Sequence, residues 1–302
     1  MTELRPAPRN SSWSAHLALV GVQFGFGLFP LFGKWAFEAF SAEAIACWRV
    51  AFGTVLFLGL AFLRYGRRVW PSRSDFGRLQ LCALLGVAVN QALYLEGLKR
   101  SSAMTTGLMM MLVPVFTYLV AVAVRQERFD RRRSLGIAVA FGGTALLVST
   151  GQSAAGRGDE PLLGALFLAG NTFCYASYLV ASKPLMRRYP PLVVLAWVYA
   201  LSGWTFLLLW PGSAGWVPAE VSRRSWLSMA MILALPTSLS YLLNIWALGR
   251  VSASTTAVYV FSQPLIAGVA GILAFDERPS LSMAFAALAI FLGIGLVVPS
   301  RR

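Results

Sequence analysis

Long apolar runs separated by short polar segments dominate this chain. A helix needs about twenty apolar residues to cross the hydrocarbon core of a bilayer. Ten runs meet this standard, at residues 14–37, 42–63, 76–98, 102–124, 133–151, 161–182, 192–211, 226–248, 252–274 and 280–298. The gaps between them are rich in proline, glycine, serine and arginine, which is typical of loops at a membrane surface. The pattern predicts an all-α integral membrane protein with ten transmembrane helices.

The apolar runs also repeat at a spacing of 150 residues. The stretch Arg100–Thr106 returns as Arg250–Thr256, and four single residues return at the same spacing: Pro114 as Pro264, Glu127 as Glu277, Gly143 as Gly293 and Val148 as Val298. Each repeat holds five predicted helices, and an odd number makes the second repeat enter the membrane from the opposite side. Inverted repeats around a central cavity are typical of secondary transporters.

The repeat and the charges together predict the organisation of the chain. Eighteen lysines and arginines fall on the side of the membrane that holds both termini, and six fall on the other side. The positive-inside rule therefore places both termini in the cytoplasm. The expected parts are a cytoplasmic tail (1–13), a first five-helix repeat (14–151), a linker (152–160), an inverted second repeat (161–298) and a short cytoplasmic tail (299–302).

Composition supports a membrane protein and excludes several other classes. Of the 302 residues, 57% are hydrophobic and 13% charged, whereas soluble domains average about 25% charged residues. The net charge of +14 comes from clusters between apolar runs, so we expect a lipid bilayer and no nucleic acid as the partner. Cys47, Cys82 and Cys174 lie inside apolar runs, and His16 is the only histidine. We expect no metal site, disulfide framework or cofactor.

The chain resembles the EamA-type exporters of the drug/metabolite transporter superfamily. The resemblance rests on the inverted five-plus-five repeat and the Arg-x-Ser-Ala-x-Thr-Thr motif, which a proline follows in the fourth and ninth helices. Glu127, Glu277 and Arg49 also match the family pattern. The resemblance extends from about residue 14 to 298. Within the superfamily, the chain is most similar to YddG-type amino-acid exporters. The resemblance implies a bacterial inner-membrane protein that exports amino acids, aromatic and neutral ones included, by alternating access.

Polar and aromatic residues at mid-helix depth are the candidates for contact with this small-molecule substrate, because an unpaired polar group in hydrocarbon is unfavourable. The predicted substrate-binding residues are Gln23, Asn90, Gln91, Tyr94, Met109, Asn171, Tyr175, Tyr178, Ser240, Asn244, Tyr259 and Gln263. Hydrogen bonding between helices is the alternative reading of each polar one. Pro114 and Pro264, at equivalent places in the two repeats, are predicted hinges because proline removes a helical hydrogen bond.

Charged residues inside the spans are few. No Asp or Glu falls at mid-depth, which favours facilitated export over proton coupling, since a proton relay needs ionisable groups in the membrane. Arg49 is the one deep cation. It is expected to meet Glu43, helix-end carbonyls or a substrate carboxylate, and a structural partner is the favoured reading. Glycines in the fifth and tenth helices allow close packing inside a monomer or in a homodimer.

Other function classes fit less well. A polytopic enzyme needs clustered acids or a His-containing pair, which twelve acids and one histidine do not provide. An ion channel needs a filter loop or charged rings. An exchanger of phosphorylated sugars or nucleotide sugars, from the same superfamily, is the alternative within the transporter class; its cargo calls for several cations in the cavity, and only Arg49, Lys34 and Lys183 are available.

Overall fold

The computed structural model describes residues 13–149, 160–209, 218, 220–248, 250 and 259–297. Within these ranges every regular element is a helix. The first repeat contains α1 (Trp13–Gly27), α2 (Phe29–Ala36), α3 (Ala42–Tyr65), η1 (Gly66–Val69), η2 (Arg73–Asp75), α4 (Phe76–Ala83), η3 (Leu84–Ala88), α5 (Val89–Arg100), α6 (Ala103–Met110), α7 (Val113–Ala123) and α8 (Arg131–Ser149). The second contains α9 (Pro161–Arg188), α10 (Pro191–Leu209), α11 (Arg223–Ile232), η4 (Leu233–Leu239), α12 (Ser240–Leu248), α14 (Gln263–Phe275) and α15 (Leu281–Val297). The second copy of the repeated motif, residues 251–256, lies outside these ranges.

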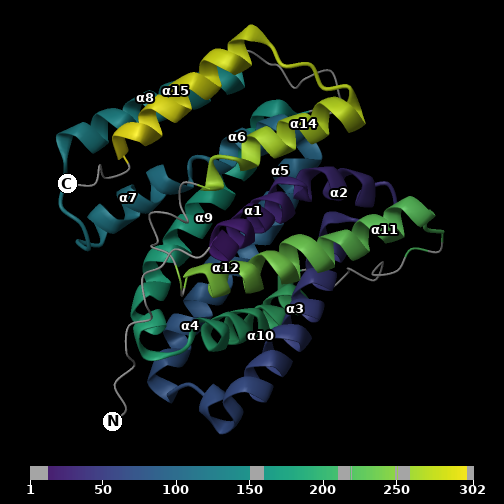
Figure 1. Ribbon diagram of the computed structural model, residues 1–302, viewed down its shortest axis with the longest axis vertical. Coiled ribbons are helices and arrows are strands. Elements are labelled where there is room, and N and C mark those ends of the chain that lie inside the picture. The colour runs from purple at the N-terminus through teal and green to yellow at the C-terminus, as the bar shows by residue number, and fades with distance from the viewer. Residues whose placement is uncertain are drawn as a thin grey trace.

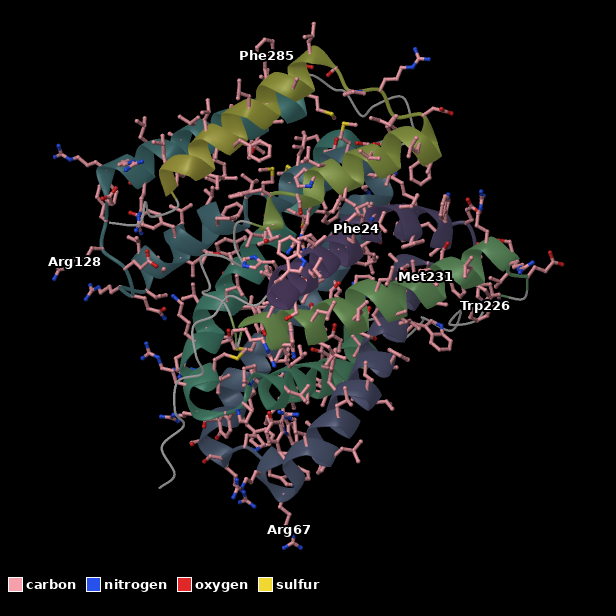
Figure 2. The ribbon with its side chains drawn as sticks, viewed as in Figure 1. Phe24, Arg67, Arg128, Trp226, Met231 and Phe285 are labelled. Carbon is pink, nitrogen blue, oxygen red and sulfur yellow. The ribbon has the colours of Figure 1, made fainter. Side chains whose placement is uncertain are left out.

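Six helical segments are long and apolar enough to cross a membrane: Trp13–Ala36, Ala42–Val69, Arg73–Arg100, Ala103–Ala123, Leu162–Arg188 and Arg223–Ala247. Three shorter apolar helices cover Pro191–Trp204, Gln263–Phe275 and Leu281–Leu296. Large apolar side chains such as Phe24 and Phe285 are more than half exposed, and Figure 2 shows Phe285 pointing away from the bundle. The all-helical membrane architecture is confirmed, while the count of ten crossings stays a prediction.

Serine side chains begin several of these helices. Ser41, Ser102 and Ser222 have extended backbones, and each hydroxyl accepts a hydrogen bond from an amide three residues later. Such caps satisfy an amide that the first helical turn leaves free. The helices therefore begin at positions that the polar gaps of the sequence indicate.

Each helix of the first repeat packs against a helix of the second. The pairs are α1 with α12, α3 with α10, α5 with α9, α6 with α14, and α8 with α15. In Figure 1, α8 and α15 run side by side at one edge of the molecule, and α3 and α10 lie together at the opposite edge. The main buried core draws residues from both repeats, among them Phe29, Tyr94, Tyr199 and Met229. The core is therefore shared between the repeats.

Two repeat-equivalent glycines allow the close approach of α8 and α15. A Cβ atom added at Gly143 would lie 2.8 Å from the carbonyl oxygen of Ala286, and one added at Gly293 would lie 2.5 Å from that of Gly136. Contacts this short are not available to a larger side chain, so glycine brings the two backbones together. The fifth and tenth predicted helices thus pack against each other within one chain.

Candidate functional site

Four of the predicted substrate-binding residues form hydrogen-bonded pairs with one another across the two repeats. Gln263 Nε2 in α14 donates to Gln23 Oε1 in α1 at 2.7 Å. Asn90 in α5 and Asn171 in α9 each donate from the side-chain amide to the other's backbone carbonyl, at 3.1 and 2.9 Å. These contacts match the open alternative of interhelical bonding and place the four residues at the interface of the repeats.

Other predicted residues are more dispersed. Ser240 Oγ donates to the carbonyl of Val22 at 3.2 Å, and the hydroxyl of Tyr259 lies 2.7 Å from Nδ1 of His16. Met109 is buried in the shared core, whereas Asn244 on α12 is only partly buried. The structure therefore does not bring the whole predicted set to one point.

The aromatic members of the set lie in ring clusters. Tyr94 stacks on Phe29 with ring centroids 4.7 Å apart and an interplanar angle of 20°. Tyr175 and Tyr178 in α9 have centroids 5.9 Å apart, and the Tyr178 ring rests on Gly86, where a Cβ atom would lie 2.7 Å from it. Offset rings of this kind offer a flat apolar wall to a bound side chain.

A second ring cluster links helices of both repeats. The ring centroid of Tyr199 in α10 lies 5.1 Å from that of Phe57 in α3 and 6.0 Å from that of Tyr241 in α12. The Tyr241 centroid lies 5.7 Å from that of Phe26 in α1. None of these four residues belongs to the predicted set. The interior therefore contains more aromatic surface than mid-helix polarity alone indicated.

Arg49 is the one Lys or Arg that is buried in the described ranges, with 4% of its surface exposed. Its Nε donates to Oγ1 of Thr237 at 2.9 Å, and its guanidinium carbon lies 4.4 Å from the centroid of the Phe29 ring. Tyr94 stacks on that ring as well. Arg49 and Tyr94 thus share one aromatic neighbour.

Each repeat contains a π-helical segment at the equivalent place, η3 at Leu84–Ala88 and η4 at Leu233–Leu239. In η4, Thr237 Oγ1 and Ser238 Oγ donate to the carbonyls of residues 232 and 233, at 2.8 and 2.6 Å. A π-helix widens the turn, leaves carbonyls that these hydroxyls satisfy, and is frequent at functional sites. Thr237, which holds Arg49, lies in one of these segments.

The two predicted hinge prolines each lie where a helix restarts. Pro114 occupies the first turn of α7, directly after a turn at Met111 and Leu112, and Pro264 occupies the first turn of α14, after a turn at residues 261 and 262. Proline fits the first turn because its missing amide would be free there in any case. Hinge motion stays a prediction.

At one end of the bundle, the Glu277 carboxylate binds the first turn of α6. Its two oxygens accept hydrogen bonds from the amides of Ala103 and Met104 at 2.7 and 3.0 Å, and the side chain is only 3% exposed. An anion at a helix N-terminus satisfies free amides and the helix dipole. This contact, which we call the Glu277 clasp, joins the fourth and ninth predicted helices.

The contacts that the structure describes for the equivalent Glu127 are different. Its backbone is placed like that of Glu277, since their amides donate to Ala121 and Gly271, six residues earlier, at 3.1 and 3.2 Å. Its side chain, however, is 39% exposed and pairs with Arg133 at 2.8 Å. A Cβ atom at Gly271 would collide with the Glu277 carboxylate, and the first repeat has alanine at that place. The glycine at position 271 therefore makes room for the Glu277 carboxylate in the clasp.

Sequence reasoning missed several residues of this interior. Phe29, Thr237 and Tyr199 were not predicted. The predicted set was chosen mainly for polar side chains at mid-helix depth, and a π-helix has no clear sequence pattern. The sequence indicated Glu277 as a repeated residue that matches the family pattern, and not as a partner of α6. Ser102 marks the start of α6, whose first amides need hydrogen-bond acceptors. This was a signal that a buried carboxylate such as that of Glu277 could bind there.

Both repeats resemble known proteins over nearly their full length. Residues 13–149 and 162–298 each match the EamA-like transporter family. A WAT1-related protein of Arabidopsis thaliana is 26% identical over 95% of this chain and 86% of its own length. An "Uncharacterized transporter" of Archaeoglobus fulgidus is 24% identical over 85% of this chain and 88% of its own length.

Two further similarities concern cargo and fold. A protein of Streptantibioticus cattleyicolor named "Probable terminal-alkyne amino-acid exporter" is 30% identical over 77% of this chain and 75% of its own length. One crystal structure superposes with a TM-score of 0.61 at 18% identity, covering 94% of this chain and 96% of that one, which supports the fold alone. Because the family match covers both repeats, the chain belongs to the EamA-like transporter family.

Proposed function

We propose that this protein exports small metabolites, above all neutral and aromatic amino acids, across the bacterial inner membrane by alternating access. The observation that carries the proposal is the packing of each described major helix against a helix of the other repeat around one shared core. Two inverted units joined in this way can exchange conformations and expose a central site to each side in turn.

The proposed topology has ten crossings with both termini in the cytoplasm. The ion pairs of the described ranges support it, because each joins two residues that the charge pattern places on the same side. They are Arg100 with Glu96 and Glu160, Arg133 with Glu127, Arg188 with Asp75, and Arg224 with Glu38. In this orientation the Glu277 clasp closes the periplasmic end between α6 and α14, and export requires it to open.

The chemistry of the interior supports amino acids as cargo. The described core is rich in tyrosine and phenylalanine, with hydrogen-bonding amides at the repeat interface and a single buried cation, Arg49. Rings suit neutral and aromatic side chains, whereas a phosphorylated sugar calls for several cations. The relative named as an amino-acid exporter agrees with this choice.

Counterflow in reconstituted vesicles tests the proposal. Proteoliposomes preloaded with one unlabelled amino acid are given a trace of a labelled one from a panel of neutral, aromatic, acidic and basic members. We expect accumulation of neutral and aromatic amino acids and little of the charged ones. Vesicles that accumulate none of the panel would overturn the proposed function, and protein-free vesicles provide the background.

A further inference from the structure

Among the residues that the structure describes, Arg49 has no anionic partner for its charge. It belongs to α3, a helix apolar enough to span the membrane, and is 4% exposed. Its contacts are the hydroxyl of Thr237 and the ring of Phe29. A buried cation is strongly unfavourable unless it is paired, and neither of these neutral groups neutralises it.

No carboxylate of the described ranges pairs with Arg49. The five ion pairs of these ranges are formed by other arginines near helix ends. Glu43 lies on the same helix as Arg49 but forms no ion pair with it. Asp75 and Glu277, the buried acids, have partners of their own in Arg188 and in the first turn of α6. The structural partner that was expected for Arg49 is therefore the neutral hydroxyl of Thr237, and no counter-ion lies beside it in the described ranges.

The anchor fixes how the guanidinium is presented. Nε is engaged by Thr237 Oγ1, which itself donates to the carbonyl of Ile232 in the wall of η4. With Nε occupied, the two terminal nitrogens remain as a planar fork. Such a fork matches the two oxygens of a carboxylate in a bidentate hydrogen-bonded pair.

The neighbouring groups suit the rest of an amino acid. Tyr94 and Arg49 contact the same Phe29 ring, so an aromatic surface adjoins the cation. Gln91 lies one helical turn before Tyr94 on the same face of α5. It is 3% exposed, and its Oε1 has no hydrogen-bond partner within the described ranges. That oxygen is an acceptor suited to an ammonium group.

We propose that Arg49 binds the carboxylate of the transported amino acid, with Thr237 orienting the guanidinium and Gln91 accepting from the substrate ammonium. The inference rests on the proposed function and names the group of the substrate that this site recognises. A single fork selects a monoanionic carboxylate. A doubly charged phosphate would leave charge uncompensated here.

Transport of matched substrates tests the assignment. Phenylalanine and phenylalaninamide share the ring and the ammonium group, but only phenylalanine has a carboxylate. We expect wild-type vesicles to prefer phenylalanine by about tenfold or more, the usual worth of a charge-assisted hydrogen bond. Arg49→Gln should abolish that preference by lowering phenylalanine transport about tenfold or more while amide transport stays within about twofold. Arg49→Lys should be intermediate, because it keeps the charge and loses the fork.

Arg64→Gln is the matched control, since Arg64 lies on the same helix but is exposed at its cytoplasmic end in the proposed orientation. It should behave like the wild type. Retained amide transport in Arg49→Gln shows that the variant is folded. Equal loss of both substrates in that variant, or unchanged phenylalanine transport, would overturn the role of Arg49 and leave the proposed function standing.

Binding to the wild type gives a test that needs no variant. Phenylalanine should raise the melting temperature of the detergent-solubilised protein, and phenylalaninamide at the same concentration should raise it far less. Equal stabilisation by the two compounds would overturn the assignment. Failure of counterflow for the whole amino-acid panel would instead overturn the proposed function.

Discussion

Buried charges in this protein are held by three different kinds of partner. Arg49 has a neutral hydroxyl and an aromatic ring, Glu277 has two backbone amides, and Asp75 has the hydroxyl of Tyr189 at 2.7 Å together with Arg188 at 2.9 Å. Of these three groups, only Asp75 forms an ion pair within the described residues, although Lys34 lies near enough to Glu277 to attract its carboxylate. The other two charges gain or lose their stabilisation as the surrounding helices move, which is the property expected of groups that act in a transport cycle.

Glu277→Gln should open the clasp without removing its bulk. Hydrogen bonds that involve a charged group contribute about 1.5–3 kcal/mol each in mutational series, so we expect a cysteine placed at Ser101 to react faster with a membrane-impermeant maleimide added from the periplasmic side. The native cysteines are all buried and provide a low background. Unchanged labelling would show that the clasp does not hold this end closed.

Gly271→Ala tests the same clasp from the other side of the contact, because the added Cβ atom collides with the Glu277 carboxylate. It should increase labelling at position 101 in the same direction as Glu277→Gln. Gly268→Ala on the same helix is the control, since its Cβ atom would meet only Met104 at an ordinary 3.8 Å. Equal effects of the two alanine variants would trace the change to helix propensity and not to the clasp.

Among elements, the helix ends show how the two repeats are joined. The start of α4 is linked to the end of α9 through Asp75 and Arg188, and the start of α11 is linked to the end of α2 through Arg224 and Glu38. These are equivalent connections in an inverted arrangement: the third predicted helix meets the sixth, and the eighth meets the first. Helix ends of one repeat are thus fixed by the other repeat.

The packing of α8 against α15 can be tested with neighbouring glycines. Gly143→Leu forces a side chain against the Ala286 carbonyl, and overpacking of this kind typically destabilises by about 1–3 kcal/mol. Gly142→Leu is a matched control, because a Cβ atom there meets nothing within 4 Å. Both changes add the same helix propensity, so the difference between their melting temperatures in detergent isolates the packing. A Gly143→Leu protein as stable as Gly142→Leu would contradict the close contact.

The sequence was sufficient for much of the fold and for less of the site. Apolar run length and the 150-residue repeat predicted the helices and their two groups, because both features follow from what lipid requires of a chain. Local breaks were harder to predict: Pro30, in the first turn of α2, has no counterpart in the second repeat. Side-chain partners such as Thr237 for Arg49 depend on how helices distant in sequence rotate about their axes. No periodicity fixes that rotation.

At the scale of the whole molecule, the described interior contains few ionisable groups, and its two buried acids lie near the ends of the bundle. We therefore expect export that is driven by the gradient of the amino acid itself. Dissipating a pH gradient with a protonophore should leave the efflux rate from preloaded proteoliposomes within about twofold, because a proton relay needs ionisable groups at depth. Efflux that stops when the pH gradient collapses would contradict facilitated export.

Because each described helix has a packing partner in the opposite half of the polypeptide, the main described core belongs to both halves together. A gene divided within codons 150–160 would thus encode two fragments that are stable only when co-expressed. A precursor with a single five-helix unit could bury the same surfaces only as two copies inserted head to tail. Duplication and fusion would have made that mutual dependence permanent and left each copy free to diverge, as Ala121 and Gly271 have at equivalent places.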